Sequence, residues 1–264
     1  MTRPINIRTL NERRAAGQPF SCLTAYDATL ATLADNAGID VLLIGDSLGM
    51  VLQGHTSTLP VTLEDMIYHT RCVARAGTSS LIMADLPFMT NITTPQTLQA
   101  AGQLMQAGAH MIKLEGEAWL AETVTALAQR GIPVCVHMGL TPQSVNALGG
   151  YRVQGRDDDQ AEAMLNAAIT LEQAGAGVIL LECVPSELAG RIREALHVPV
   201  IGIGAGPDVD GQILVMHDML GATTGRAPRF VKDFMAESGS IEGAFRAYHE
   251  AVTTRCFPAP EHCF

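Results

Sequence analysis

The sequence lacks any apolar run long enough to cross a membrane, and it also lacks an excess of basic charge. No stretch approaches the roughly 20 apolar residues that a membrane span needs. Acidic residues outnumber basic ones by 27 to 17, which gives a formal net charge of −10. We therefore expect neither a membrane nor a nucleic acid as a partner. The first residues lack the apolar segment of a secretory signal, so we expect a cytoplasmic protein.

Disulfide and zinc motifs are missing as well. None of the six cysteines stands in a C-x-x-C pair, so we expect reduced, mostly buried thiols. Charged residues make up only 17% of the 264 residues and apolar residues 47%, which excludes a disordered or fibrous chain. No linker or shift in composition interrupts the chain, and this favours a single domain over residues 1–264.

One pattern recurs along the chain. A helical segment ends at a glycine, a short apolar run follows, and the run ends in a polar residue; the five clearest runs are 41–46, 81–85, 111–115, 134–137 and 178–182. Continuous apolar runs of this length are typical of parallel strands that are buried on both faces. Further strands are expected at 21–27, 200–204 and 214–217.

Helix and strand thus alternate about eight times, which predicts either a (β/α)₈ barrel or an open doubly wound sheet. A barrel gathers the carboxyl ends of all its strands around one mouth, and polar residues end five successive strands here, so the barrel is favoured. Segments 5–16 and 241–252 are predicted to be additional helices near the two ends, and residues 257–264 an extended tail.

Three acidic residues, Asp46, Asp85 and Glu115, end consecutive predicted strands. In a barrel they would meet at the open face, where three unpaired carboxylates would repel one another. A hard divalent cation relieves that repulsion, and oxygen ligands suit Mg²⁺. The alternative is that each acid caps a helix or pairs with an arginine.

Lys113 stands two residues before Glu115, so the two side chains share one face of their strand and Lys113 would point into the barrel. There it would neutralise a bound anion, form a Schiff base or pair with a carboxylate. Glu182 follows an apolar run, and the resulting partial desolvation suits a general base. A solvated acid at the strand end is the alternative for Glu182.

Other groups near the strand ends have two interpretations each. His137 would either donate a hydrogen bond to a substrate oxygen or serve the structure alone. Cys183 is interpreted as buried filler rather than as a nucleophile. The glycine-rich segment 202–206 would cradle an anion or form a tight turn. The long loops 47–62 and 141–156 are predicted to form the substrate site or its lid.

Seven short motifs occur in order along the chain: LTAYD at 23–27, GDSLGM at 45–50, QGHTSTLPVT at 53–62, KLEG at 113–116, HMGLTPQ at 137–143, VQGR at 153–156 and GIGAG at 202–206. With them, the chain closely resembles the ketopantoate hydroxymethyltransferase family from about residue 23 to residue 234. One departure is visible, because Val209 opens a VDGQ run where the family pattern has CDGQ.

The resemblance implies a (β/α)₈ barrel of the phosphoenolpyruvate/pyruvate-binding type that assembles as a homo-oligomer, typically a decamer. It implies transfer of a hydroxymethyl group from 5,10-methylenetetrahydrofolate to the ketoacid 3-methyl-2-oxobutanoate, giving 2-dehydropantoate, with Mg²⁺ as cofactor. The ketoacid and the folate would be its small-molecule partners.

The resemblance also assigns roles to residues that match the family motifs. Asp46 and Asp85 would bind Mg²⁺ and lie against the substrate, with Glu115 as a further metal-site residue. Ser47 and Lys113 would hold the ketoacid, and His137 would line its site. Glu182 would be the proton acceptor.

Three other functions remain open on the sequence. A Mg²⁺-dependent C–C lyase or mutase of the same barrel group would use a similar cation site. A Schiff-base aldolase would use Lys113 as its nucleophile. A non-catalytic binding barrel would leave the strand-end residues without a chemical role.

Overall fold

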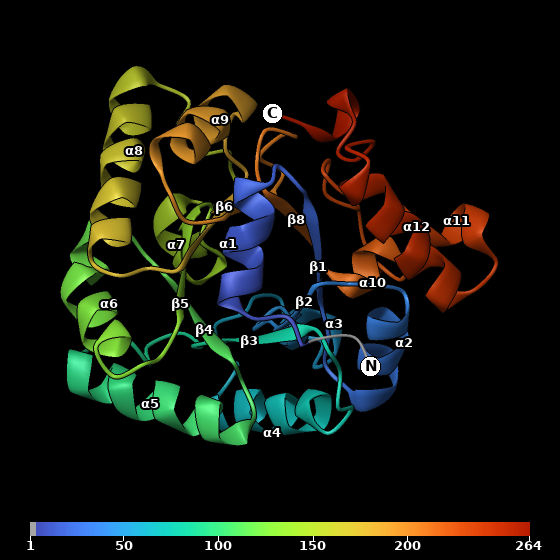
Figure 1. Cartoon of the computed structure of the whole chain (residues 1–264), viewed down its shortest axis with the longest axis horizontal. Coiled ribbons are helices and arrows are strands. Elements are labelled where there is room, and N and C mark those ends of the chain that lie inside the picture. Colours follow the sequence, from blue (N-terminus) through green and yellow to red (C-terminus); the bar gives the residue numbers. More distant parts are fainter. Residues whose placement is uncertain (1–3) are drawn as a thin grey trace.

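The computed structural model describes residues 4–264, whose strands close into one parallel barrel surrounded by helices (Figure 1). The strands are β1 (Phe20–Thr24), β2 (Val41–Ile44), β3 (Leu81–Asp85), β4 (Met111–Glu115), β5 (Val134–Gly139), β6 (Val178–Glu182), β7 (Val200–Ile203) and β8 (Gly211–Leu214). Each strand pairs in parallel with the next, and β8 closes the barrel by pairing Ile213 with Cys22 of β1. The predicted barrel fold is confirmed.

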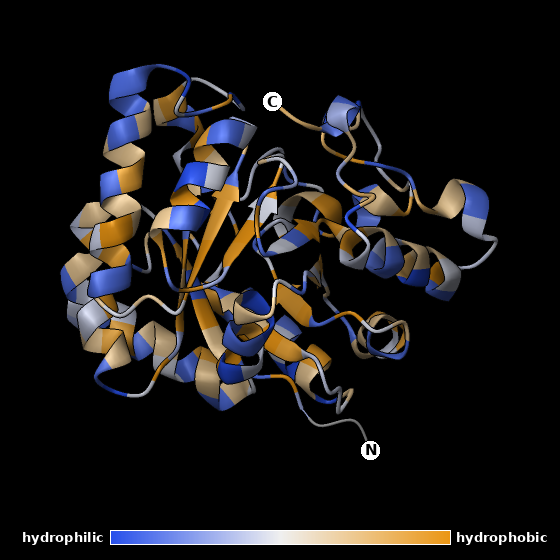
Figure 2. Cartoon of the chain, turned by 45° about the horizontal axis from the view of Figure 1, so that its top comes forward, coloured by the Kyte–Doolittle hydropathy of each residue, from blue (hydrophilic) through white to orange (hydrophobic). Residues whose placement is uncertain are grey.

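Helices cover the outside of the barrel. They are α1 (Ile7–Ala15), α2 (Ala28–Asn36), α3 (Leu48–Val51), α4 (Leu63–Ala74), α5 (Thr94–Ala107), α6 (Ala121–Ala128), α7 (Val145–Leu148), α8 (Asp158–Gln173), α9 (Ser186–Ala195), α10 (Met216–Met219), α11 (Met235–Ser238) and α12 (Ile241–Thr253), with short 3₁₀ turns at Ala118–Leu120, Pro142–Ser144 and Pro260–His262. In Figure 2 the strands are mostly apolar, whereas the outer helices are striped. This is the pattern expected when strands are buried on both faces and helices on one.

Local signals explain where the helices begin and end. The side chain of Thr62 accepts a hydrogen bond from the backbone N–H of Asp65, and the Asp65 carboxylate accepts one in return, so α4 starts at a capping box. Thr93 caps α5, and Pro95 occupies its first turn.

Helix α1 lies against the end of the barrel opposite its mouth. Leu10 is fully buried. Arg13 Nη2 lies 2.7 Å from Asp40 Oδ1, just before β2, and Arg14 pairs with Asp210, just before β8. Two arginines of one helix thus pair with acids just before two strands, at the amino ends of the barrel strands. Residues at this end of a barrel usually contribute to stability, and those at the opposite end to chemistry.

The prediction for the eighth strand is wrong. Residues 216–219 form the helix α10, and β8 instead runs over Gly211–Leu214. Gly211 pairs with Phe20, and a Cβ atom on Gly211 would lie 2.5 Å from the Phe20 ring. The strand therefore opens with a glycine and a glutamine, which do not produce the apolar run that marks the other strands.

The predicted extended tail is also wrong. Residues 260–262 form a 3₁₀ turn, and the carbonyl oxygen of Phe264 accepts a hydrogen bond from the backbone N–H of Ser186 at 3.0 Å. Phe257 packs edge-on against Phe234 and Tyr248, with ring centroids 5.5 and 5.9 Å away. These apolar contacts return the tail to the mouth of the barrel.

The remaining sequence predictions concern thiols and membranes. All six cysteines are free, but only Cys22, Cys135 and Cys183 are fully buried. No helix within residues 4–264 combines the length and the apolar character that crossing a membrane requires.

Candidate active site

A cavity of about 920 Å³ opens at the carboxyl ends of the strands, and every strand from β1 to β8 contributes to its wall. The seven residues that the sequence predicts for the active site all line this cavity: Asp46, Ser47, Asp85, Lys113, Glu115, His137 and Glu182. The structure thus brings together side chains that lie up to 136 positions apart in the sequence.

The acids on the cavity floor are held by a defined set of donors. Asp85 is almost completely buried; its Oδ1 accepts a hydrogen bond from Lys113 Nζ at 2.6 Å, and its Oδ2 accepts one from the backbone N–H of Asp46 at 3.0 Å. Gln143 connects the other two acids. Its side-chain amide donates to Asp46 Oδ2 at 2.8 Å, and its backbone N–H donates to Glu115 Oε2 at 2.9 Å.

The charged side chains on the cavity floor shift one another's pKa values. Burial and the neighbouring charges of Asp85 and Glu115 raise the pKa of Asp46 well above its usual range. Burial by itself would lower the pKa of Lys113, but the surrounding carboxylates, Asp85 foremost, outweigh burial and raise it. A raised pKa favours the charged form of Lys113, whereas a Schiff base requires the neutral amine.

His137 lies between two carboxylates. Its Nδ1 is 3.3 Å from Glu115 Oε1, and its Nε2 is 3.2 Å from Glu182 Oε2. Burial and the charge of Lys113 oppose protonation, yet the two carboxylates prevail and raise the pKa of His137 to about 9. The raised pKa favours the charged ring, which attracts both acids, although neither ring nitrogen forms a hydrogen bond of normal geometry with a described residue.

The donor set fits a Mg²⁺ ion. Among residues 4–264, no three acid, imidazole or thiol groups converge tightly enough to enclose a metal on their own. Mg²⁺ does not require such a cage, because it usually takes one or two carboxylates and completes its octahedron with water and substrate. Asp46 and Asp85 would supply those carboxylates. Burial first, and then the charges of Asp85 and Glu115, raise the pKa of Asp46, and a bound cation would offset both effects. Glu115 Oε1 is buried without a hydrogen-bond partner among the described residues.

The backbone around Glu182 is shaped by two unusual residues. Gly139 has φ +86°, and a Cβ atom there would lie 2.4 Å from the carbonyl oxygen of Glu182. Cys183 adopts φ +47°, a region that residues other than glycine rarely occupy. Burial, helped by the charge of Glu182, raises the pKa of the Cys183 thiol. This agrees with the interpretation of Cys183 as buried filler.

Both long loops reach the cavity. In loop 47–62, the Oγ of Ser47 is hydrogen-bonded to the Tyr26 hydroxyl at 2.9 Å, and Met50 and Thr58 line the wall. Loop 141–156 contributes Gln143 beside the acids and Tyr151 at the rim. The Tyr151 hydroxyl lies 3.7 Å from the sulfur of Met50, so the two loops meet across part of the mouth.

The glycine-rich segment 202–206 forms a tight turn. Gly204 has φ +59°, and a Cβ atom on it would lie 2.9 Å from the Phe230 ring and 3.0 Å from that of Phe264. A Cβ on Gly206 would lie 2.4 Å from the Ser186 Oγ. Protein side chains therefore fill the space that a bound anion would need.

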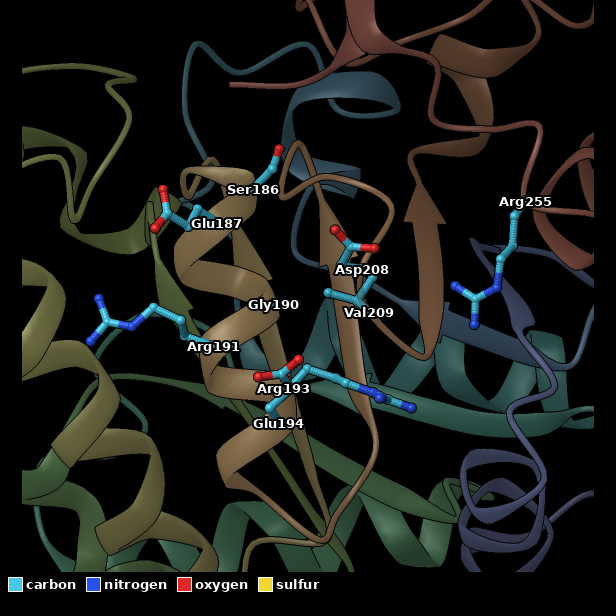
Figure 3. Close-up of a pocket in the computed structure, with 9 residues that line it drawn as sticks. All are labelled: Ser186, Glu187, Gly190, Arg191, Arg193, Glu194, Asp208, Val209 and Arg255. Atoms are coloured by element: carbon cyan, nitrogen blue, oxygen red, sulfur yellow. The ribbon is translucent and has the colours of Figure 1, made fainter.

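A second cavity of about 540 Å³ lies between α9 and the loop before β8 (Figure 3). Its acids and arginines are mixed, and Arg191 and Arg193 point to opposite sides of α9 in Figure 3. Arg193 pairs with Asp210 at 2.9 Å, and Arg191 pairs with Glu162 at 3.2 Å. None of the residues that line this second cavity lies at the carboxyl end of a strand.

Comparison with known proteins agrees with this geometry. A family model described as ketopantoate hydroxymethyltransferase matches residues 4–260. The chain belongs to this family. It is 62% identical to the 3-methyl-2-oxobutanoate hydroxymethyltransferase of Chromohalobacter salexigens, over 98% of this chain and 99% of the relative. It is 61% identical to the enzyme of the same name from Marinobacter nauticus, over 98% of each chain. The predicted family and the prediction of an enzyme are confirmed.

Solved structures of low sequence identity share the fold. A putative phosphonomutase from Burkholderia cenocepacia superposes with a TM-score of 0.66 at 17% identity, covering 82% of this chain and 95% of that one. A phosphonopyruvate hydrolase in complex with oxalate and Mg²⁺ superposes with a TM-score of 0.63 at 15% identity, covering 98% and 93%. A 2,3-dimethylmalate lyase, described as a member of the PEP mutase/isocitrate lyase superfamily, gives 0.61 at 18% identity, with 82% coverage of both chains.

The departure at Val209 lies away from the mouth. Val209 is buried, packs against Gly202 and faces the second cavity. This substitution in a ketopantoate hydroxymethyltransferase therefore leaves the strand-end residues untouched.

Several residues of the site were not identified from the sequence. Segment 222–230 and Phe264 line the cavity, whereas Tyr26 and Gln143 are hydrogen-bonded to the lining residues Ser47 and Asp46. Gln143 stands in the HMGLTPQ motif, which is the one signal that pointed to it. Phe264 gives no such signal, because its position depends on how the tail folds back.

Proposed function

We propose that this protein transfers a hydroxymethyl group from 5,10-methylenetetrahydrofolate to 3-methyl-2-oxobutanoate, giving 2-dehydropantoate. The observation that carries the proposal is that Glu182, a carboxylate at a strand end, shares one cavity with the buried Lys113–Asp85 pair and with Asp46. Membership of the ketopantoate hydroxymethyltransferase family supports the choice of reaction.

The ketoacid would lie on the cavity floor. Its carboxylate and keto oxygen are both acceptors, so they require donors or cations. Lys113 supplies positive charge from below, and Ser47 supplies a hydroxyl that the Tyr26 hydroxyl holds in place. His137, with its ring between Glu115 and Glu182, completes the wall beside the substrate.

Asp46 and Asp85 are the residues that would hold Mg²⁺, with Glu115 as a further residue of the metal site. When bound, the cation would act as a Lewis acid that stabilises negative charge on the keto oxygen. A solved relative of the same fold holds Mg²⁺ together with oxalate, which is itself a small chelating acid. The solved relative supports the choice of Mg²⁺ here.

Glu182 would remove the proton from C3 of the ketoacid. Its carboxylate stays in position because His137 Nε2 lies 3.2 Å away. The resulting carbanion carbon forms a bond to the one-carbon unit of the folate, both bonds from that unit to the folate nitrogens break, and water supplies the hydroxyl oxygen. Tetrahydrofolate leaves, and the proton taken by Glu182 together with the two protons of water ends on the new hydroxyl oxygen and on the two freed nitrogens. Lys113 stabilises the negative charge that develops on the substrate, a task for which a fixed buried cation needs no reorganisation.

Exchange of the C3 proton tests this chemistry without the folate. The protein is incubated with 3-methyl-2-oxobutanoate in D₂O with Mg²⁺, and loss of the C3 proton signal is followed by NMR. We expect exchange that EDTA abolishes and that excess Mg²⁺ restores. Absence of exchange, combined with cleavage of isocitrate or 2-methylisocitrate, would support a lyase instead.

Titration calorimetry tests the metal site. We expect that Asp85→Asn weakens Mg²⁺ binding, because it removes one of the two carboxylates. Asp208→Asn is the matched control, since Asp208 is exposed and lies at the second cavity. Wild-type Mg²⁺ affinity in Asp85→Asn would contradict the assignment.

We also propose that the protein works in the cytoplasm as a homo-oligomer, with a decamer as the expected size. Light scattering of the purified protein measures the mass directly. A monomer at micromolar concentration would contradict this part of the proposal.

A further inference from the structure

The cavity at the barrel mouth is larger than the ketoacid needs. Its volume of about 920 Å³ lies near the top of the range of pockets that hold a whole drug-sized ligand. In the proposed reaction the small ketoacid would occupy only the floor, beside Asp46 and Lys113. The outer part of the cavity is therefore available to the second substrate of the proposed reaction.

The wall of this outer part carries two arginines, and the acid of α10 that also lines the cavity, Asp218, accepts a hydrogen bond from Thr223 Oγ1 at 2.6 Å. Segment 222–230, between α10 and α11, lines the cavity and contributes Arg226 and Arg229. Arg226 is exposed and forms no ion pair or hydrogen bond with any other residue in 4–264. The net charge of the chain is −10, so acids that could pair with an arginine are plentiful. A guanidinium group without an acidic partner at the mouth therefore requires an explanation.

Arg229 is oriented, but its charge is also not neutralised. Its Nε donates to the carbonyl oxygen of Glu261 at 3.0 Å, and its guanidinium carbon lies 5.4 Å from the centroid of the Phe264 ring. No carboxylate of the described residues pairs with it. The two nitrogens that remain at the end of the guanidinium can therefore receive an anion from the cavity.

The floor of the cavity has a different charge pattern. Asp46, Asp85, Glu115 and Glu182 lie there, and the one lysine among them, Lys113, is already paired with Asp85. A second anionic substrate would be repelled by the floor and attracted by the rim. A tetrahydrofolate has the matching shape: its reactive ring carries no carboxylate, whereas the glutamate at its other end carries two.

We infer that Arg226, with Arg229 beside it, binds the glutamate carboxylates of the folate substrate, so that the one-carbon unit points down toward Glu182. This inference rests on the proposed function. Guanidinium groups recognise carboxylates through paired hydrogen bonds. The Phe264 ring, which forms the wall under Arg229, provides an apolar surface for the aromatic linker of the folate.

Steady-state kinetics with two folates test the inference. The probes are 5,10-methylenetetrahydrofolate and 5,10-methylenetetrahydropteroate, which lacks the glutamate. In Arg226→Gln we expect the KM for the folate to rise roughly ten- to a hundredfold, as for loss of a charged hydrogen bond, and the KM for the ketoacid to stay unchanged. Arg226→Lys should recover part of the loss.

The pteroate analogue separates lost recognition from a structural effect. Wild-type enzyme should prefer the folate over the pteroate by a similar factor, and the double variant Arg226→Gln/Arg229→Gln should lose this preference. Arg246→Gln is the matched control, because Arg246 is an exposed arginine on α12 that pairs with Glu242. It should behave as wild type.

The outcomes are distinguishable. A double variant that keeps the wild-type KM for the folate, or that still prefers the folate over the pteroate, overturns the inference. Exchange at C3 of the ketoacid without folate should be equal in all these variants. If the wild-type protein itself shows no exchange, the proposed function fails, and the inference fails with it.

Discussion

Lys113 Nζ lies 2.6 Å from Asp85 Oδ1, and both side chains are at least 95% buried inside the barrel. Burial by itself would lower the pKa of this amine, but the surrounding carboxylates outweigh burial and raise the pKa. The raised pKa favours the charged form of the amine. The pair therefore serves the cavity as a fixed charge next to Asp46, which accounts for Lys113 without any covalent chemistry.

If Lys113 acts as a fixed cation, borohydride should trap no adduct between the protein and the ketoacid. Mass spectrometry of the treated protein checks this. An added mass equal to the reduced ketoacid, located on Lys113, would instead support the Schiff-base aldolase. Any other amine that reacts by chance would also react in denatured protein, which is the control.

The same pair predicts a stability effect. Lys113→Met leaves the buried carboxylate of Asp85 without its cation, and we expect the free energy of unfolding to fall by roughly 3–5 kcal/mol. Asp85→Asn in the same chain should recover part of it. Arg246→Met is the comparison, because it breaks an exposed pair worth no more than about 1 kcal/mol. Urea unfolding measures all three.

Replacement of the proposed base predicts a loss of rate rather than of binding. In Glu182→Gln we expect turnover and C3 exchange to fall by roughly 10²–10⁴, because a positioned general base contributes about that much, while the ketoacid still binds. Glu187→Gln, at an exposed position on α9, should leave both unchanged. Unchanged exchange in Glu182→Gln would remove Glu182 from the role.

Ionisation of His137 predicts how stability depends on pH in the metal-free protein. Its pKa is raised from 6.5 to about 9 in the folded state. The charged ring therefore stabilises the fold fully below pH of about 6.5, and this contribution disappears as the pH rises through about 9.

Thermal unfolding in EDTA should show this loss in the wild type. His137→Gln should lack the part of the decrease in Tm that lies between these two pH values. His197→Gln, whose ring is 94% exposed, should retain it. An identical pH profile in wild type and His137→Gln would contradict the assignment of the charge.

Much of the site could be predicted because strand ends are local features. Asp46, Asp85, Glu115 and Glu182 each follow an apolar run, and a parallel barrel brings all such ends to one rim. Their convergence follows from the order of the strands and requires no knowledge of side-chain packing.

The rest depends on contacts that no local pattern encodes. Gln143 joins two acids from within a loop, and Phe264 reaches the cavity because the tail packs on Phe234 and Tyr248. Strand β8 was misplaced for a related reason. Its first residue must be small to fit against Phe20, so the strand shows no apolar run.

Gly139 on β5 lies directly against the backbone of Glu182 on β6. A Cβ atom there would lie 2.4 Å from the carbonyl oxygen of Glu182, so Gly139→Ala must move β5 away from β6. Because a misplacement of about 1 Å can cost roughly 10² in rate, we expect C3 exchange to fall by about that factor, with little change in Mg²⁺ affinity.

Gly131→Ala is a matched control, since Gly131 has a similar φ of +75° but no atom within 4 Å of its Cβ position. Both variants place an alanine at a similar positive φ, so slower exchange only in Gly139→Ala isolates the displacement of Glu182. Equal exchange rates in the two variants would show that the close contact has no part in placing the base.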